Sequence, residues 1–252
     1  MIPKIIHYCW FGGNPLPDLA KKCISSWKKF LPDYEIKEWN EQNVDFSQCP
    51  VYVQEAYQAK KWAFVSDYVR LKVLYKYGGL YFDTDVEVIK SLDPILKHGM
   101  YMGGEVTTQN GQAVHSINPG LGFAVEPGVN IIKEILDSYQ NDHFLNEDGS
   151  CNLKTIVTRT TEIFARYGYD QTKNDIQYIA EIYVYPEEYF SPKSLVDGKM
   201  RIKSNTYSIH HYMASWESHS SVVRGKIYRF CLRTFGERFS SKMRKIFTKK
   251  DV

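Results

Sequence analysis

The sequence lacks the patterns that would place it among secreted, membrane-spanning or zinc-binding proteins. Its five cysteines are widely spaced and form no C-x-x-C pair, so we expect reduced thiols and neither a disulfide framework nor a zinc site. No apolar run reaches the length of a membrane span. The first residues show no charged leader followed by a long apolar run, so no signal peptide is predicted. These absences favour a cytoplasmic protein.

Two further absences narrow the class of ligand. The sequence has no G-x-G-x-x-G after its first predicted strand, which argues against a Rossmann dinucleotide fingerprint. The net charge is only +3, and the basic excess lies at one end. Residues 222–252 carry ten Lys and Arg against two acidic residues, whereas the remainder carries 22 basic and 27 acidic residues. A mildly acidic body does not offer the basic surface that nucleic acid requires, so no nucleic-acid partner is predicted.

What is present is typical of a folded domain. The chain has 252 residues, of which 43% are hydrophobic, enough for a full core. Predicted strands alternate with predicted helices, which indicates an α/β layer fold. The strands are expected at residues 2–11, 34–39, 80–82, 86–89, 101–106 and 182–185, and the helices at 18–30, 52–61, 63–77, 129–139 and 153–167. The polar residues 107–115 predict a loop over the functional site.

The C-terminal part has a pattern of its own. Apolar residues recur there at three- and four-residue steps with Lys and Arg between them: Ile227, Phe230, Cys231, Phe235, Phe239, Met243 and Phe247. The pattern predicts a basic amphipathic helical tail over residues 221–252, after a domain formed by residues 1–220. Such a helix could bind an anionic membrane surface or dock on its own domain, and the pattern favours neither.

The central stretch of the chain ends in two closely spaced acids. A helix that stops at Gly78 and Gly79 is followed by a short strand and then by Asp83-Thr84-Asp85. Alternation along an extended chain would place Asp83, Asp85 and Glu87 on one face. Carboxylates this close resist joint ionisation unless a cation lies between them. A hard divalent ion, Mn²⁺ or Mg²⁺, shared with a phosphate is the simplest solution.

Asp67 and Arg70 precede this acidic turn and lie one helical turn apart. They could hold hydroxyl groups of a polar ligand whose phosphates sit on the metal. The alternative is a surface ion pair that contributes little to stability.

These residues carry a resemblance to a known family. S-D-x-x-R from Ser66 to Arg70, followed by G-G-x-Y-x-D-x-D from Gly78 to Asp85, resembles the signature of glycosyltransferase family 32. That group includes yeast-type initiating mannosyltransferases and many bacterial capsule and lipooligosaccharide transferases, and the pattern is also similar to the glucosyltransferase domain of large clostridial toxins. The opening I-P-K-x-I-H with W and G-G, and a late H-H followed by S-W, extend the resemblance over most of residues 2–216. It implies a GT-A type single domain, in which a Rossmann-like nucleotide-binding sheet is flanked by helices.

The resemblance also implies roles for individual residues. Asp85 would be the main ligand of the metal and Asp83 a second one. Two adjacent histidines on a strand face opposite ways, so only one of His210 and His211 can reach the metal, and we predict His211. The expected catalytic set is Asp67, Arg70, Asp83 and Asp85. The expected contacts of the nucleotide and the donor sugar are Cys9, Trp10, Ser66, Tyr81, Asn118, Ser215 and Trp216.

The implied reaction is a metal-dependent transfer of a sugar from a nucleoside diphosphate to an acceptor hydroxyl, with retention at the anomeric carbon. UDP-galactose, UDP-glucose or UDP-N-acetylglucosamine is the favoured donor. A glycan or lipid-linked acceptor in bacterial surface polysaccharide synthesis, such as that of capsules, is expected, at the inner face of the cytoplasmic membrane if the tail binds lipid. The T-G-P triplet of many members is absent from residues 156–160, so the acceptor geometry does not carry over.

Three alternatives stay open from the sequence. The first is a transferase that uses GDP-mannose. The second is a phosphohydrolase with an aspartyl nucleophile, although Glu87 stands where such enzymes need Thr or Val. The third is a non-catalytic protein that binds sugar nucleotides. A calcium turn in a binding module is disfavoured, because the glycine and the closing bidentate glutamate of the twelve-residue loop are missing.

Overall fold

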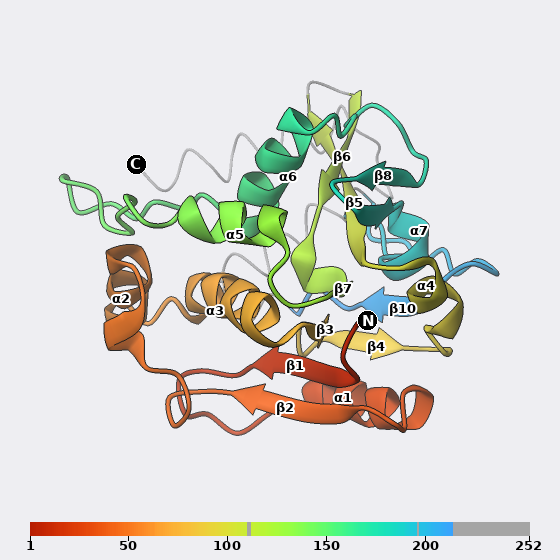
Figure 1. Ribbon diagram of the computed structural model, residues 1–252, viewed down its shortest axis with the longest axis horizontal. Coiled ribbons are helices and arrows are strands. Elements are labelled where there is room, and N and C mark those ends of the chain that lie inside the picture. The colour runs from red at the N-terminus through yellow and green to blue at the C-terminus, as the bar shows by residue number, and fades with distance from the viewer. Residues whose placement is uncertain (110–111, 196, 214–252) are drawn as a thin grey trace.

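The computed structural model describes residues 1–109, 112–195 and 197–213 of the chain (Figure 1). The helices are α1 (Asp18–Phe30), α2 (Val51–Gln58), α3 (Trp62–Tyr77), α4 (Asp93–His98), α5 (Asn130–Asp137), α6 (Ile156–Arg166) and α7 (Glu187–Phe190), with short 3₁₀ turns η1 (Phe46–Gln48) and η2 (Pro119–Leu121). The strands are β1 (Ile5–Cys9), β2 (Glu35–Trp39), β3 (Gly79–Tyr81), β4 (Val86–Val88), β5 (Tyr101–Gln109), β6 (Gln112–Ile117), β7 (Phe123–Val125), β8 (Gln177–Ile179), β9 (Ile182–Tyr185) and β10 (Ser208–His210).

The main sheet has the strand order β2-β1-β3-β7-β5-β9-β8, and β6 pairs with β5 outside this path. Strand β1 is parallel to β2 and β3, and β5 is parallel to β9, whereas β7 runs antiparallel to both β3 and β5. Strands β4 and β10 form a separate antiparallel pair. The carboxyl ends of the neighbouring parallel strands β1 and β3 therefore lie at one edge of the sheet, where open α/β sheets bind ligands.

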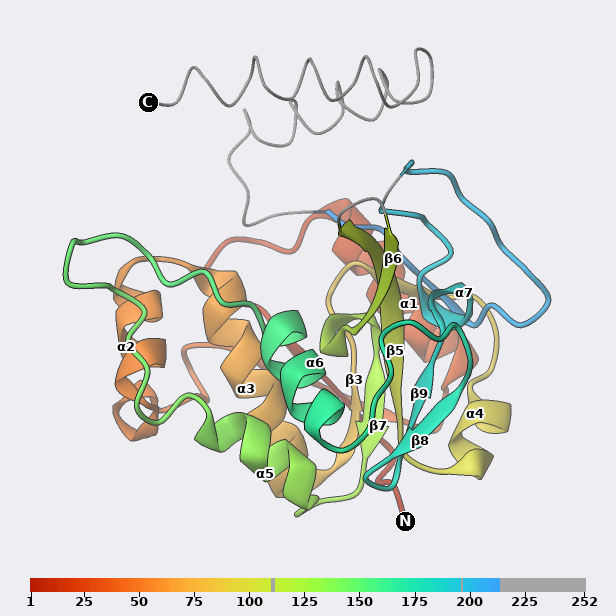
Figure 2. The same cartoon turned by 90° about the horizontal axis from the view of Figure 1, so that it is seen from above.

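Helices cover both faces of the sheet. Figure 2 shows α2, α3, α5 and α6 on one side and α1, α4 and α7 on the other. Two hydrophobic cores lie between the sheet and its helices. Neighbouring residues of β3 contribute to different cores, because side chains alternate along a strand. Tyr81 joins the core that contains Val65 and Val69 of α3, and Leu80 joins the core that contains Trp27 of α1. The predicted α/β architecture, a Rossmann-like sheet flanked by helices, is confirmed.

The structure differs from the expected elements at the predicted loop and at the acidic motif, and it adds α4, α7 and β8. Most of residues 107–115 belongs to β5 and β6, which pair from Gly104 and Ile117 out to Gln109 and Gln112, so the predicted loop was wrong. The Asn110-Gly111 dipeptide, typical of a two-residue hairpin connection, was the signal for this pairing. The chain is also not extended through the acidic motif, since Val86 N donates to Asp83 O at 3.0 Å and a turn separates β3 from β4. The predicted C-terminal tail lies outside the described residues.

The predicted helix stop is confirmed at the junction of α3 and β3. Helix α3 ends at Tyr77, and both glycines that follow have positive φ, +63° for Gly78 and +101° for Gly79. A β-carbon on Gly79 would lie 2.6 Å from Ile5 O. Glycine is therefore required both by the backbone conformation and by the close approach of β1.

A buried histidine on β1 holds this junction. The His7 side chain is fully buried, its Nε2 lies 3.0 Å from Gly78 O, and Trp39 Nε1 donates to its Nδ1 at 3.0 Å. Because Nδ1 accepts a hydrogen bond, Nε2 must carry the proton, which it donates to the glycine carbonyl. Burial lowers the pKa of His7 to about 4, so the ring is neutral in the folded protein.

The burial of His7 predicts a loss of stability in mild acid. An unfolded chain takes up a proton near the usual histidine pKa of about 6.5, whereas folded His7 does not until the pH approaches 4. The free energy of unfolding should therefore fall by about 2–3 kcal/mol between pH 7 and pH 4.5 on account of this residue. Urea unfolding at both pH values, compared with His7→Gln, isolates the effect, because glutamine can make both hydrogen bonds but does not titrate. Equal pH dependence in the two proteins would contradict the assignment.

Candidate functional site

The two aspartates of the acidic turn lie at the carboxyl edge of β1 and β3. Asp83 follows β3, and its backbone N–H donates to Gly120 O at 3.1 Å. Asp85 precedes β4 and is buried, and Met213 N donates to its Oδ2 at 2.7 Å. Two distant segments of the chain, at Gly120 and Met213, thus hold the acidic turn in place.

Helix α3 brings one cation to this edge. Arg70 Nη2 lies 2.9 Å from Asp67 Oδ1 and 3.1 Å from Asp83 Oδ1, and the Arg70 side chain is only 5% exposed. The alternative of a surface ion pair between Asp67 and Arg70 was therefore wrong. Burial raises the pKa of Asp67 to about 6 against the opposing effect of Arg70, and burial also raises the pKa of Asp83. One guanidinium thus serves two carboxylates, of which Asp67 is buried and Asp83 is 29% exposed.

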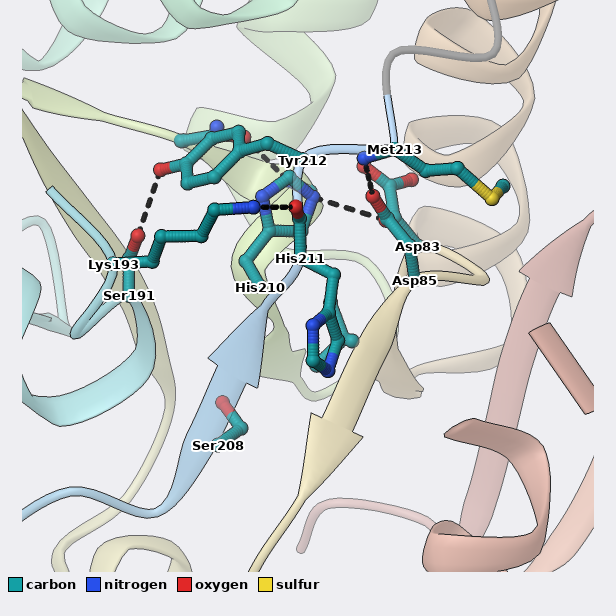
Figure 3. Close-up of polar contacts among 12 residues, drawn as sticks. Asp83, Asp85, Ser191, Lys193, Ser208, His210, His211, Tyr212 and Met213 are labelled. Carbon is teal, nitrogen blue, oxygen red and sulfur yellow. Dashed lines mark hydrogen bonds and ion pairs between the residues drawn. The ribbon is translucent and has the colours of Figure 1, made fainter. Parts of the chain in front are cut away.

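His210 completes a cluster of three potential metal ligands. Strand β10 pairs with β4 so that His210 lies opposite Val86, which places its Nε2 3.1 Å from Asp85 Oδ1 (Figure 3). One ligand atom from each of Asp83, Asp85 and His210 lies within 4.8 Å of the others. Burial opposes the charged form of Asp85, but contact with His210 and the hydrogen bond from Met213 outweigh it and hold the pKa of Asp85 below its usual range.

The predicted ligand His211 points away from this cluster. Its Nε2 lies 2.8 Å from Glu87 Oε2, and Lys22 pairs with the same carboxylate at 3.0 Å. Figure 3 shows the rings of His210 and His211 on different sides of the strand. The rule that only one histidine can face the aspartates holds, but the structure corrects the choice from His211 to His210. Glu87, which was expected beside Asp83 and Asp85, belongs to this second face.

The turn η2 lies against Asp83 and Arg70. Asn118 Oδ1 accepts from Gly120 N at 2.7 Å, and Asn118 Nδ2 donates to Glu105 Oε2 at 2.7 Å. A β-carbon on Gly120 would lie 2.1 Å from Asp83 Oδ2 and 3.0 Å from Arg70 Nη1. The missing side chain of Gly120 therefore leaves the space that the Asp83 carboxylate occupies.

Gly120→Ala should displace the carboxylate of Asp83. Gly120 has no positive φ, so alanine fits the backbone and the conflict is with the side chains of Asp83 and Arg70. If Asp83 acts at a metal centre, activity should fall by about 100-fold, as for other residues that orient metal ligands. Gly149→Ala is the matched control, because Gly149 has φ +79° with nothing within 4 Å of its β-carbon position. That control should lose stability but not activity, and equal activities of the two variants would contradict the prediction.

A pocket of about 550 Å³ opens beyond the end of β1. Trp10 lines it together with Trp62, the first residue of α3, and Trp10 Nε1 donates to Asn14 O at 2.6 Å. The other lining residues are Gly12, Gly13, Asn14, Glu38, Asn40, Glu41, Gln42 and Tyr57. Trp62, Ser66 and Arg70 follow one another at four-residue steps, so one face of α3 runs from this pocket to the acidic cluster.

Of the remaining predicted contacts, Cys9 and Tyr81 are buried. The Cys9 thiol is buried, which raises its pKa to about 12. Tyr81 is buried below Arg70, and its hydroxyl donates to Asp83 Oδ1 at 3.3 Å. Both residues support the site from behind. The half-buried Ser66 donates its hydroxyl to Trp62 O at 2.9 Å, whereas Ser215 and Trp216 lie outside the described residues.

Two residues of the site were not predicted from the sequence. Gly120 is one of many glycines, and only its distance from Asp83 distinguishes it. Glu105 is a buried acid on β5, and an acid in an otherwise apolar and glycine-rich strand was the available signal.

In the described part of the chain, no helix is both long and apolar enough to cross a membrane.

Comparisons with known proteins match a region that contains the acidic motif. Residues 17–101 match the family model described as a glycosyltransferase sugar-binding region containing a DXD motif. Inositol phosphoceramide mannosyltransferase 3 of Schizosaccharomyces pombe is 35% identical over 104 residues, which are 38% of this chain and 28% of the yeast protein. Inositol phosphoceramide mannosyltransferase 1 of the same yeast is 28% identical over 111 residues, 40% of this chain and 33% of that protein. The matched region thus spans about a third or less of these relatives.

Similar solved structures include the PaToxG glycosyltransferase, with a TM-score of 0.49 and 20% identity over 66% of this chain and 69% of that one. The galactosyltransferase LgtC has a TM-score of 0.43 and 13% identity over 94% of this chain and 99% of that one. Both TM-scores are below 0.5, so the similarity to glycosyltransferases rests on the sequence matches and on the motif. In residues 17–101 the only D-x-D is Asp83-Thr84-Asp85. Residues 17–101, which contain this motif, are therefore similar to the glycosyltransferase sugar-binding region with a DXD motif.

Proposed function

We propose that the protein is a metal-dependent glycosyltransferase that moves a hexose from a nucleoside diphosphate sugar to an acceptor hydroxyl. The observation that carries the proposal is the cluster of Asp83, Asp85 and His210, whose ligand atoms lie within 4.8 Å of one another beside Arg70. It lies at the carboxyl edge of parallel strands, where α/β sheets bind nucleotides.

The residues of the cluster fit a divalent metal ion. Carboxylate oxygens suit Mn²⁺ and Mg²⁺, and an imidazole nitrogen favours Mn²⁺ of the two. Asp83 shares the guanidinium of Arg70 with Asp67, so an ion would add positive charge beside it. A bound Mn²⁺ or Mg²⁺ would act as a Lewis acid toward the diphosphate leaving group. The carboxylate of Asp85 is held in a fixed orientation. The Met213 N–H donates to one of its oxygens, and His210 contacts the other. Arg70 lies beside Asp83, where its guanidinium could bind phosphate or sugar oxygens.

The same proposal assigns the pocket at Trp10 to the nucleoside. An indole face provides a stacking surface for a base, and stacking is tolerant of base identity. Along α3, Arg70 follows Trp62 by eight residues, a rise of about 12 Å. A nucleoside diphosphate that lies along this face would reach from the pocket past Ser66 to the cluster.

The proposal also covers the identity of the donor sugar and of the acceptor. UDP-sugars follow from the resemblance at Trp10 and Ser66, whereas the two yeast relatives are named mannosyltransferases, which favours testing GDP-mannose beside them. A glycan or lipid-linked acceptor, retention at the anomeric carbon, a bacterial pathway and a location at the cytoplasmic membrane stay predictions. The test is to incubate the protein with Mn²⁺ and a panel of UDP- and GDP-sugars, and to measure nucleoside diphosphate release with and without chelator. We expect slow, chelator-sensitive release from one donor.

Other outcomes of this panel separate the alternatives. Release of phosphate without nucleoside diphosphate would indicate a phosphohydrolase. Nucleotide binding without release, even with glycan acceptors added, would indicate a non-catalytic protein. A protein that binds no nucleotide would contradict the whole proposal.

Trp10→Ala should weaken nucleotide binding more than it slows the chemical step. Loss of one stacking partner is expected to raise the Kd for the nucleoside diphosphate by about 10-fold or more. Calorimetric titration with UDP and GDP in the presence of Mn²⁺ measures this change. Tyr178→Ala is a suitable control, because Tyr178 is an exposed aromatic on the edge strand β8, away from the pocket. An unchanged Kd for Trp10→Ala would remove the pocket from the proposal.

A further inference from the structure

A buried acid that the proposed chemistry does not use lies next to the cluster. Glu105 is on β5, only 7% of its surface is exposed, and burial raises the pKa of its carboxyl. Burial of a carboxyl group is unfavourable unless hydrogen bonds compensate for the lost water. Its hydrogen-bond partners therefore indicate what the residue does in the fold.

One oxygen of Glu105 binds two side chains from different parts of the chain. Glu105 Oε2 accepts from Asn118 Nδ2 at 2.7 Å and from the Tyr212 hydroxyl at 3.3 Å. The Tyr212 hydroxyl also lies 2.7 Å from Ser191 Oγ. Tyr212 has φ +51°, a conformation that a bulky aromatic residue rarely adopts without surrounding constraints. The hydrogen bonds of its hydroxyl to Glu105 and Ser191 supply such constraints.

Each partner of Glu105 leads to a different part of the acidic cluster. On one side, Asn118 accepts from Gly120 N, and Gly120 O in turn accepts from Asp83 N. On the other side, the ring of Tyr212 packs edge-on against the ring of His210, with centroids 4.1 Å apart. The residue after Tyr212 donates its backbone N–H to Asp85. All three potential ligands are thus linked to Glu105 through one or two intermediate residues.

We propose that Glu105 is a positioning residue for the metal centre. Its carboxylate oxygen holds the η2 turn and Tyr212 at a fixed separation, and these in turn set Asp83, Asp85 and His210 for one ion. The inference rests on the proposed function, because it assigns a role toward the metal of that site. It adds the prediction that a side chain without a place in the ligand set controls metal affinity.

Two substitutions of Glu105 test the inference. In Glu105→Gln, the amide oxygen can take the place of Oε2 and accept both hydrogen bonds, so the Kd for Mn²⁺ should stay close to that of the wild type, well under a change of about threefold. Glu105→Ala removes the acceptor and should raise that Kd by about tenfold or more. The measurement is a titration with Mn²⁺ alone, followed by the electron paramagnetic resonance signal of the free ion, at a temperature at which circular dichroism shows each variant to be folded.

Glu55→Ala is the matched control. Glu55 on α2 is also a partly buried carboxylate that links segments, since it accepts from Phe144 N at 2.7 Å and from Leu145 N at 3.2 Å, but none of these residues contacts the cluster. Its loss should lower the melting temperature and leave the Kd for Mn²⁺ unchanged. A purely structural role of Glu105 would produce the same result as this control.

The outcomes are distinguishable from failure of the proposed function. If the wild type binds no Mn²⁺, the proposed function and this inference are both wrong. If the wild type binds Mn²⁺ and folded Glu105→Ala binds it equally well, only the inference is wrong. The inference is also wrong if Glu105→Gln binds Mn²⁺ as weakly as Glu105→Ala. Should Glu105→Ala not fold, Tyr212→Phe takes its place, since it keeps the ring beside His210 and removes the hydroxyl. We expect a Kd about threefold higher for Tyr212→Phe, and an unchanged value would overturn the inference.

Discussion

Asp85→Asn should abolish sugar transfer and leave the fold intact. The substitution removes the negative charge of the carboxylate that Met213 N–H and His210 hold in place, and with it the principal proposed ligand of the metal. Metal ions contribute several kcal/mol to stabilising charge in a transition state, so the rate should fall by about 1,000-fold or more. Nucleoside diphosphate release from the best donor of the panel measures the effect, and near-ultraviolet circular dichroism checks the fold.

Glu87→Gln is the control for the loss of one acid near the motif. Glu87 lies two residues beyond Asp85, but its carboxylate faces His211 and Lys22 and not the cluster. Its substitution should leave turnover close to that of the wild type. Full activity of Asp85→Asn would contradict the assignment of the site, and equal loss in both variants would point to a general effect of charge.

Arg70→Ala should cause the largest loss of stability among single substitutions in this site. The guanidinium is 5% exposed and contacts Asp67 at 2.9 Å and Asp83 at 3.1 Å. Removing one partner of a buried ion pair leaves uncompensated charge, which costs about 3–5 kcal/mol. Urea unfolding followed by circular dichroism should show this as a lower midpoint, and activity should be lost even where the variant remains folded.

Arg201→Ala shows what the same substitution costs at the surface. Arg201 is half exposed and pairs with Asp197 in a two-point contact on a loop. Exposed pairs of this kind contribute at most about 1 kcal/mol. A similar midpoint shift for Arg70→Ala and Arg201→Ala would show that the buried network does not stabilise the protein as we infer. Added Mn²⁺ should not restore Arg70→Ala, because an ion bound at the cluster would not replace the contact between Arg70 and Asp67.

Local patterns predicted most of the elements that build the site. The helix α1 was predicted with its observed ends, and the stop of α3 before Gly78 followed from the need for positive φ. These predictions succeed because helix periodicity and glycine conformation depend on neighbouring residues. The hairpin of β5 and β6 was missed, since polar residues alternate with small apolar ones there and the Asn110-Gly111 signal was not recognised.

The choice between the adjacent histidines required the tertiary structure. The sequence predicts that His210 and His211 face opposite ways, but which of them faces Asp85 depends on how β10 pairs with β4. A shift of one residue in that register would exchange the two rings. Glu105 and Gly120 were missed for a related reason, since their importance comes from contacts with residues far away in the chain.

The sequence by itself determined the class of fold, the acidic motif and its placement between a glycine-terminated helix and a strand, because these depend on spacing along the chain. Only the tertiary structure decided that Arg70 is a buried cation between two acids, that His210 joins Asp83 and Asp85, and that Glu105 lies behind them. The physical reason is that charge, burial and ligand geometry are properties of groups brought together from distant segments. Strand register and the packing of α3 on the sheet set those distances, and neither can be read from local sequence.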